Sequence, residues 1–170
     1  MKVLLAVDEP NFAKAITDFV VGHKWEENVE FIIMSIVEPL KVASMMAFLP
    51  GPYLDESTAK HKELQESIVE ATAGAIKKAF PESTVTRIVC EGLASDELMK
   101  EITITKPDVL VIGSHGKHGI QRVLLGSVSM FMVSHAPCSV VVVRTDIIEK
   151  GEQEERTEKD PKERTTKAVA

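Results

Sequence analysis

Glycine and hydroxyl residues with a regular spacing form the strongest chemical signal in the chain. Gly113-Ser114-His115-Gly116 is followed, after nine further residues, by Gly126-Ser127. Glycines let the backbone approach an anion closely, and successive N–H groups can then converge on phosphate oxygens. A helix beginning at Gly126 would add unpaired N–H donors and the positive end of its dipole, with Ser127 as its cap. The pattern therefore predicts a phosphate-binding loop.

The spacing differs from the two commonest nucleotide-binding patterns. No Lys-Ser or Lys-Thr pair follows the glycines as in a P-loop, and the dinucleotide pattern would open the first helix of the chain instead of the last. The plainer alternative is a tight loop followed by a helix cap. A second candidate is Asp8, which follows the apolar run 2–7. It is a candidate ligand contact and handle for Mg²⁺, and it could also cap the next helix, a role that is compatible with ligand contact.

Other reactive side chains carry weaker signals. His115 and His118 stand in the same glycine-rich stretch without an accompanying acid or cysteine, so solvated histidines are expected there in preference to a metal site. Cys90 and Cys138 lack metal-ligand spacing and are expected to be reduced, structural thiols. No nucleophile, base and orienting acid stand at interpretable positions, so an enzyme is not the leading hypothesis.

Alternating apolar runs and amphipathic segments predict the architecture. Strands are expected at 2–7, 29–37, 83–90, 108–113 and 139–144, and helices at 10–22, 57–80, 94–105 and 126–135. Strands joined by crossovers of this length favour a three-layer α/β fold with a five-stranded parallel sheet. Ligands of such sheets lie beyond the carboxyl ends of the strands where the winding reverses, here in the loops after Val7 and Ile112. The strand 83–90 is expected at a sheet edge.

The inward faces of the helices are predicted from apolar residues at helical spacing. In the last helix Val128, Phe131 and Met132 are expected to point inward, and Ser95 or the residue before it is expected to cap the helix at 94–105. The stripe predicted for the long helix consists of Leu64, Ile68, Ala71, Ala75, Ile76 and Ala79. Residues 38–55, which include Met45-Met46, predict a long and partly apolar loop.

Composition narrows the function classes. The 170 residues are 44% hydrophobic and carry a net charge of −6, which is typical of one soluble domain. We expect this domain at 1–145 and a charged, disordered tail at 146–170. The apolar runs fall short of the ~20 residues of a membrane span, and no signal sequence is apparent, so a cytoplasmic protein is expected. The acidic balance argues against nucleic acid as a partner.

These motifs resemble the universal stress protein family. Its nucleotide-binding members carry Gly, two residues, Gly, nine residues, Gly and then Ser or Thr, and all four positions match here. The segment Leu124-Leu125-Gly126-Ser127-Val128-Ser129 and the ending His135-Ala136-Pro137-Cys138 are similar to the family as well. The resemblance covers about residues 1–144. It implies the strand order 3-2-1-4-5 and ATP, or ADP or AMP, bound between the loops after strands one and four.

The resemblance also implies roles for single residues. Asp8 matches the acid that contacts the nucleoside, Ile36 the residue whose backbone meets adenine, and Ala6 and Val7 the pocket floor. The phosphate and ribose contacts match Gly116, Gly126, Ser127, Val128 and Ser129, beside Gly113, Ser114 and His115 of the cradle. The chain departs from the family at Glu9-Pro10, where small residues are usual. A carboxylate there would weaken nucleotide binding or narrow the pocket.

The family resemblance further implies a symmetric homodimer. Val140-Val141-Val142-Val143 form the last strand, which is apolar and lies at a sheet edge in the implied order. The leading hypothesis is a dimeric, ATP-binding module that acts in stress response or signalling. The alternatives are an interaction module of the same family that has lost its nucleotide, and a slow ATPase or self-phosphorylating protein. An electron-transfer flavoprotein subunit is disfavoured by the length of the chain.

Overall fold

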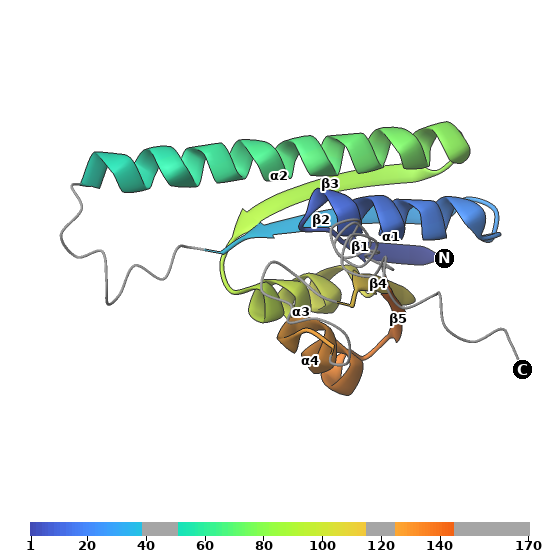
Figure 1. The fold of residues 1–170 in the computed structure, drawn as a ribbon. Coiled ribbons are helices and arrows are strands. Elements are labelled where there is room, and N and C mark those ends of the chain that lie inside the picture. Colours follow the sequence, from blue (N-terminus) through green and yellow to red (C-terminus); the bar gives the residue numbers. More distant parts are fainter. Residues whose placement is uncertain (39–50, 115–124, 145–170) are drawn as a thin grey trace, which may run out of the picture.

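A computed structural model describes residues 1–38, 51–114 and 125–144, with the side chains of 51–58 excluded (Figure 1). The elements follow one another as β1 (Lys2–Ala6), α1 (Pro10–Gly22), β2 (Glu30–Val37), α2 (Gly51–Ala79), β3 (Thr84–Glu91), α3 (Ala94–Thr105), β4 (Val109–Gly113), α4 (Ser127–His135) and β5 (Ser139–Val143). Strands and helices thus alternate as predicted.

The strands form one parallel sheet in the order β3-β2-β1-β4-β5. The central strand β1 pairs with β2 and β4, so that Leu5 lies opposite Ile33 on one side and Val111 on the other. β3 and β5 are the two edges. The predicted fold class, strand order and edge position of 83–90 are confirmed.

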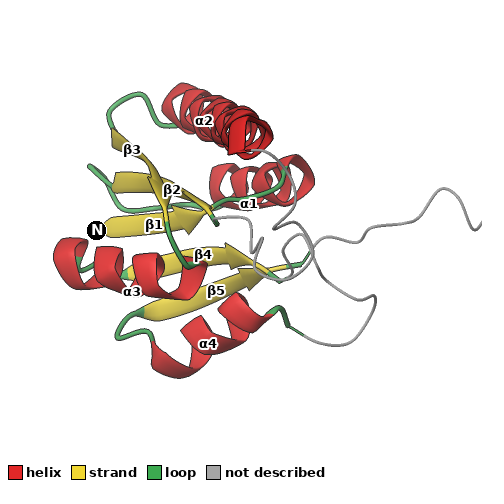
Figure 2. Ribbon diagram, turned by 90° about the vertical axis from the view of Figure 1, so that its left-hand side faces the viewer, coloured by secondary structure: helices red, strands yellow, loops and turns green. Residues whose placement is uncertain are grey.

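Helices cover both faces of the sheet, with α1 and α2 on one and α3 and α4 on the other (Figure 2). Alternate residues of each strand point to opposite faces. On β1, Val3 and Leu5 therefore pack toward α1 and α2, and Leu4 packs toward α3 and α4. Strand order runs outward from β1 in both directions, so the winding reverses between β1 and β4. This is the position at which open α/β sheets bind ligands.

The long helix α2 corrects the sequence analysis in two respects. It begins at Gly51, within the predicted loop 38–55, because a proline such as Pro52 is well accommodated in the first turn of a helix. Its buried face is also turned from the predicted stripe: Leu64 is 48% exposed, and Ala71 and Ala79 are exposed too. The buried residues are Gln65, Ile68, Val69, Thr72, Ala73 and Ile76. The prediction missed this face because Gln65 and Thr72, which are polar, lie on it.

Two other helices begin and pack differently from the prediction. The N-cap of α3 is Leu93, without a side-chain bond, and the Glu38 carboxylate instead accepts from the Ala94 N–H at 3.1 Å. A carboxylate brought from the end of β2 thus replaces the predicted Ser95 cap. In α4, Met132 is buried and Val128 packs against the core as expected, but Phe131 is 37% exposed. Only one narrow stripe of this short helix faces the sheet.

Some predictions lie outside the described residues. These are the conformation of 39–50 with Met45-Met46, and that of the tail 146–170. Within the described part of the chain, none of the helices combines the length and hydrophobicity that a membrane span requires.

Candidate functional site

The carboxyl ends of β1 and β4 bring the two predicted loops to the same edge of the sheet. The Val7 N–H donates to the Met34 carbonyl at 2.9 Å, which extends the pairing of β1 with β2 by one residue before the chain turns at Asp8. Ala6 is the last residue of β1, and Val7 follows it directly. Ala6 packs toward the α3 and α4 face, and Val7, 3% exposed, packs toward α1 and α2. These two predicted floor residues therefore flank β1 on opposite faces, directly before Asp8.

The residues on both sides of the segment 115–124 lie together at the end of β4. The Ser114 N–H donates to the Val143 carbonyl at 2.8 Å, and the Gly126 N–H donates to the Ser114 carbonyl at 2.8 Å. Gly113, Ser114 and Gly126 of the predicted cradle are thereby brought into one place. His115 and Gly116 lie outside the described residues.

The amino end of α4 points its first turn to this place. Its N-cap is Gly126, with φ −58° and ψ 155° and no side-chain cap, while Ser127 is already the first helical residue. The prediction that Ser127 caps the helix is therefore wrong. In an α-helix the first N–H groups have no partner within the helix, so Ser127, Val128 and Ser129 present such donors, together with the positive end of the helix dipole.

Ser129 fixes α4 to the sheet. Its side chain is 4% exposed, and its hydroxyl donates to the Gly113 carbonyl at 2.6 Å. The Ser129 hydroxyl thus bonds the helix to the end of β4. Because its proton is donated to Gly113, the predicted contact of Ser129 with a phosphate would come through the backbone N–H. Glycine at 113 accepts the brace with its carbonyl, at the end of a fully paired strand.

A polar network that the sequence analysis missed lies beside Asp8. The Asp8 Oδ1 accepts from the Nε2 of Gln65 at 3.3 Å, and the Gln65 Oε1 accepts from the Ser35 hydroxyl at 2.6 Å. The Gln65 Nε2 also lies 3.2 Å from the Nε2 of His61, one turn away on α2. The N-cap of α1 is Glu9, so the alternative that Asp8 caps this helix is not what the structure has.

Ile36 and Glu9 complete the surroundings of Asp8. Ile36 pairs with Cys90 of β3 near the carboxyl end of β2, the strand next to β1, and it is partly buried toward α3 and α4. Glu9 is partly exposed at the amino end of α1, and it forms no side-chain cap bond. Pro10 follows as the first helical residue, where its missing N–H costs nothing.

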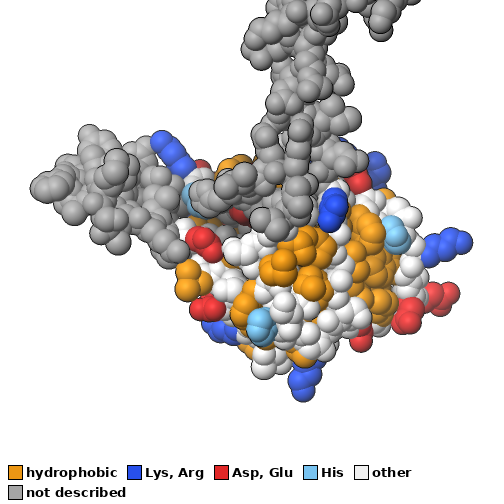
Figure 3. Space-filling view, turned by 60° about the horizontal axis from the view of Figure 1, so that its bottom comes forward, with side chains coloured by type: hydrophobic (Ala, Val, Ile, Leu, Met, Phe, Trp, Pro, Cys, Tyr) orange, Lys and Arg blue, Asp and Glu red, His pale blue; other side chains and the backbone are white. Residues whose placement is uncertain are grey.

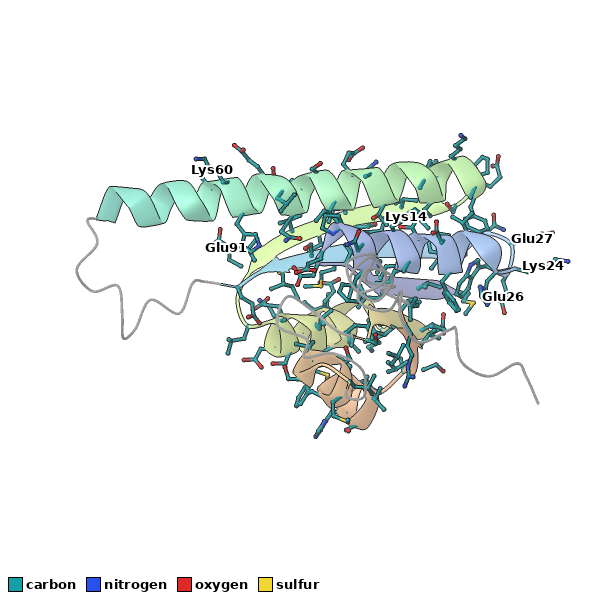
Figure 4. The ribbon with its side chains drawn as sticks, viewed as in Figure 1. Lys14, Lys24, Glu26, Glu27, Lys60 and Glu91 are labelled. Atoms are coloured by element: carbon teal, nitrogen blue, oxygen red, sulfur yellow. The ribbon has the colours of Figure 1, made fainter. Side chains whose placement is uncertain are left out.

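Charged side chains stand at both ends of the strands. Lys24, Glu26 and Glu27 lie between α1 and β2, at the amino end of β2 (Figure 4). At the carboxyl ends Lys60 points outward from α2, and Glu91 rises from β3 toward that helix. Glu91 lies 3.7 Å from the Lys62 ammonium, a contact between exposed groups.

Metal ligands and thiols add little to the site. The described parts of the chain hold no group of three His, Cys, Asp or Glu residues able to bind a metal ion. Burial raises the pKa of the Cys90 thiol, and Glu97 raises that pKa further. Burial likewise raises the pKa of Cys138. A raised pKa disfavours the thiolate, which is the reactive form of a cysteine.

Comparison with known sequences identifies one family. Residues 1–144 match the model of the universal stress protein family. A universal stress protein A family protein of Schizosaccharomyces pombe is 28% identical over 149 residues, which are 84% of this chain and 45% of that protein. The chain thus spans less than half of that relative. A putative universal stress protein of Staphylococcus aureus is 26% identical over 147 residues, 85% of this chain and 84% of its own length.

Solved structures share the fold. The universal stress protein UspA of Lactobacillus plantarum superposes with a TM-score of 0.69 at 19% identity, over 85% of this chain and 97% of that one. A family protein of Arabidopsis thaliana with AMP bound has a TM-score of 0.60 at 17% identity, over 86% and 93%. A universal stress protein of Archaeoglobus fulgidus in complex with dAMP reaches 0.54 at 17% identity, over 84% and 97%. Another universal stress protein is in complex with cAMP, with a TM-score of 0.58 at 20% identity, over 85% and 97%.

Proposed function

The chain belongs to the universal stress protein family, and from this premise we propose that it binds an adenine nucleotide, ATP above all, at the carboxyl edge of the sheet between β1 and β4. The phosphates would lie at the amino end of α4, and the nucleoside beside Asp8 and Ile36. AMP, dAMP and cAMP are bound by relatives with the same fold, which supports the choice of an adenine nucleotide.

The observation that carries the proposal is the braced amino end of α4. Gly126 is an N-cap without a side chain, and the Ser129 hydroxyl bonds the helix to the Gly113 carbonyl at 2.6 Å. The first-turn N–H groups are therefore held at a fixed distance from the end of β4. A phosphate is the ligand that such donors and the helix dipole favour. Ser127, which is exposed, adds a hydroxyl at the same end.

The nucleoside half would be held from β1 and β2. Asp8 follows β1 and Ile36 belongs to the neighbouring β2, both at the carboxyl ends of these strands, and Ala6 and Val7 would form the floor of the pocket. A carboxylate accepts hydrogen bonds, so Asp8 would receive one from the nucleoside. Cradle residues 113–116, including Ser114, His115 and Gly116, complete the proposed set.

Magnesium would enter with the phosphates. Mg²⁺ is commonly held by one or two carboxylates together with substrate phosphates and water, and Asp8 would supply a carboxylate here.

We further propose that the protein works as a cytoplasmic homodimer whose state reports bound nucleotide, without rapid turnover. β5 is an edge strand that presents Val140, Val141 and Val142, all partly buried in the single chain. Next to it, Figure 3 shows apolar side chains gathered on the side of the molecule that α4 covers, and Met130 and Val133 are 47% and 49% exposed. Pairing of two β5 edges would cover unpaired strand groups and apolar surface together.

One observation favours a second function. The Glu9 carboxylate stands directly after Asp8 at the amino end of α1. Its charge would repel a nucleotide phosphate approaching the same edge. A family member that has lost its ligand and acts by protein contacts alone is therefore the alternative.

Titration calorimetry of the purified chain separates the two functions. Protein stripped of bound molecules is titrated with AMP and with Mg-ATP, and with adenosine and GMP as matched ligands that lack the phosphate or change the base. Saturable binding of AMP and ATP, with adenosine at least tenfold weaker, supports the nucleotide site. No heat with any adenine ligand, and no thermal shift, would overturn it and favour the interaction module.

A further inference from the structure

The buried face of α2 contains one amide among apolar residues. Gln65 is 0% exposed and shares its face with Ile68 and Ile76. Burying an amide without hydrogen bonds destabilises the fold, so a buried glutamine needs polar partners. All of its close polar partners in the described chain lie toward the carboxyl edge of the sheet, next to the proposed nucleotide site.

The partners define the orientation of this amide. Its Oε1 accepts from the Ser35 hydroxyl at 2.6 Å, and its Nε2 faces the Asp8 Oδ1 at 3.3 Å. Turning the amide by 180° would place its carbonyl oxygen against the carboxylate, and both groups would then be acceptors. The carboxylate of Asp8 therefore selects this orientation of the amide, and the Ser35 hydroxyl, which can donate or accept, is compatible with it.

His61 supports the same orientation from the next turn of α2. Its Nε2 lies 3.2 Å from the Gln65 Nε2, which can only donate. In the tautomer that leaves Nε2 without a proton, the imidazole accepts this hydrogen bond. Two acceptors, Asp8 and His61, face the two N–H groups of the amide, and one hydroxyl faces its oxygen.

We propose that Gln65 is a positioning residue, which holds the Asp8 carboxylate in the orientation that receives a hydrogen bond from the nucleoside. The inference rests on the proposed function. Asp8 is partly exposed in the short connection between β1 and α1, so a ligand at this edge can reach it. An oriented acceptor binds a donor better than a carboxylate that rotates freely, because its rotation is already restricted before binding. The nucleoside donor is a ribose hydroxyl or the adenine amino group.

The test compares Gln65→Leu with Thr72→Val. Thr72 is 3% exposed on the same face of α2, two turns further along, so its substitution removes a buried polar group without touching Asp8. Each variant of the full chain is titrated with AMP. We expect Gln65→Leu to weaken AMP binding about tenfold, and Thr72→Val to leave it within twofold of the wild type.

A double-mutant cycle adds a readout that a merely structural role would not move. In the Asp8→Ala background, Gln65→Leu should have no further effect on affinity, since the group through which it acts is gone. Titrations with 2′-deoxy-AMP, 3′-deoxy-AMP and IMP identify the donor. The analogue that lacks it should bind the wild type and Gln65→Leu equally well.

The outcomes separate this inference from the proposed function. No binding of AMP by the wild type would overturn both. If the wild type binds AMP, the inference alone is overturned by equal losses in Gln65→Leu and Thr72→Val. It is also overturned if Gln65→Leu weakens AMP binding as much in the Asp8→Ala background as in the wild type. The same holds if Gln65→Leu weakens the binding of all three analogues as much as that of AMP.

Discussion

Replacing Gly126 by aspartate should separate folding from nucleotide binding. Gly126 is the N-cap of α4 with φ −58° and ψ 155°, a conformation that an aspartate adopts without strain. Aspartate is also a preferred N-cap residue, because its carboxylate accepts from the N–H groups of the first turn. The substitution therefore leaves the fold intact or stabilises it by a few tenths of a kcal/mol, by rough analogy with other caps.

The same carboxylate should expel a phosphate. It would take the place of the ligand at the first-turn N–H groups and add a like charge at close range. Two unit charges 4 Å apart repel by about 4 kcal/mol at an effective dielectric constant of 20. Gly126 is partly exposed, so solvent reduces this value. A loss of about 2 kcal/mol, or thirtyfold in AMP affinity, is then the smallest effect expected.

The assay is titration calorimetry with AMP beside a thermal unfolding curve. Gly74→Asp is the matched control, because it adds the same charge on α2, away from the site. Gly74 is exposed, and outside the adjacent helix backbone no atom lies within 4 Å of the position that a Cβ would take. Gly126→Ser keeps a neutral cap and should bind within a few-fold of the wild type. A folded Gly126→Asp protein that binds AMP within threefold of the wild type would refute a phosphate at the amino end of α4.

Three more predictions follow from single features of the chain. Glu9→Gln should bind ATP about threefold more tightly with adenosine affinity unchanged, because a repelling charge is removed; calorimetry showing equal gains for both ligands would contradict this. Val141→Lys on the β5 edge should halve the mass measured by light scattering, whereas Thr86→Lys on the exposed β3 edge should not. The raised pKa of Cys90 should make its alkylation slower than that of the unfolded chain at pH 8. The contribution of Cys90 to stability is fully present below the pKa of this thiol in the unfolded chain. It is lost as the pH rises through the higher pKa of Cys90 in the folded protein.

The sheet could be predicted because its signals lie in the chain itself. Buried parallel strands such as 109–112 are continuous apolar runs, and only a few topologies connect five of them by helices. The hypothesis of a phosphate-binding loop likewise needed only the local sequence, because the spacing from Gly113 to Ser127 can be recognised without knowing the fold. Helix caps were predicted less well. The Glu38 carboxylate reaches the amino end of α3 from another strand, and no local pattern contains that contact.

The face of α2 explains why the Asp8 network was missed. The prediction placed apolar residues such as Leu64 and Ala71 on the buried face, but the face that is buried contains Gln65, Ile68 and Thr72. The same face continues at helical spacing through Val69, Ala73 and Ile76. Periodicity alone could therefore have found it if polar residues had been allowed on the buried face. A glutamine in an otherwise apolar stripe is then the available signal, because a buried amide requires partners.

The two halves of the proposed site are built by different means, and this predicts how they respond to substitution. The phosphate half depends on backbone N–H groups of α4, which side-chain changes alter only by adding charge or removing the Ser129 brace. The nucleoside half depends on side chains from three elements: Asp8 after β1, Ser35 of β2 and Gln65 of α2. Gly126→Asp should therefore weaken AMP far more than adenosine, while Gln65→Leu should weaken both by the same factor. Equal losses of AMP and adenosine in Gly126→Asp would mean that the two halves are not separable.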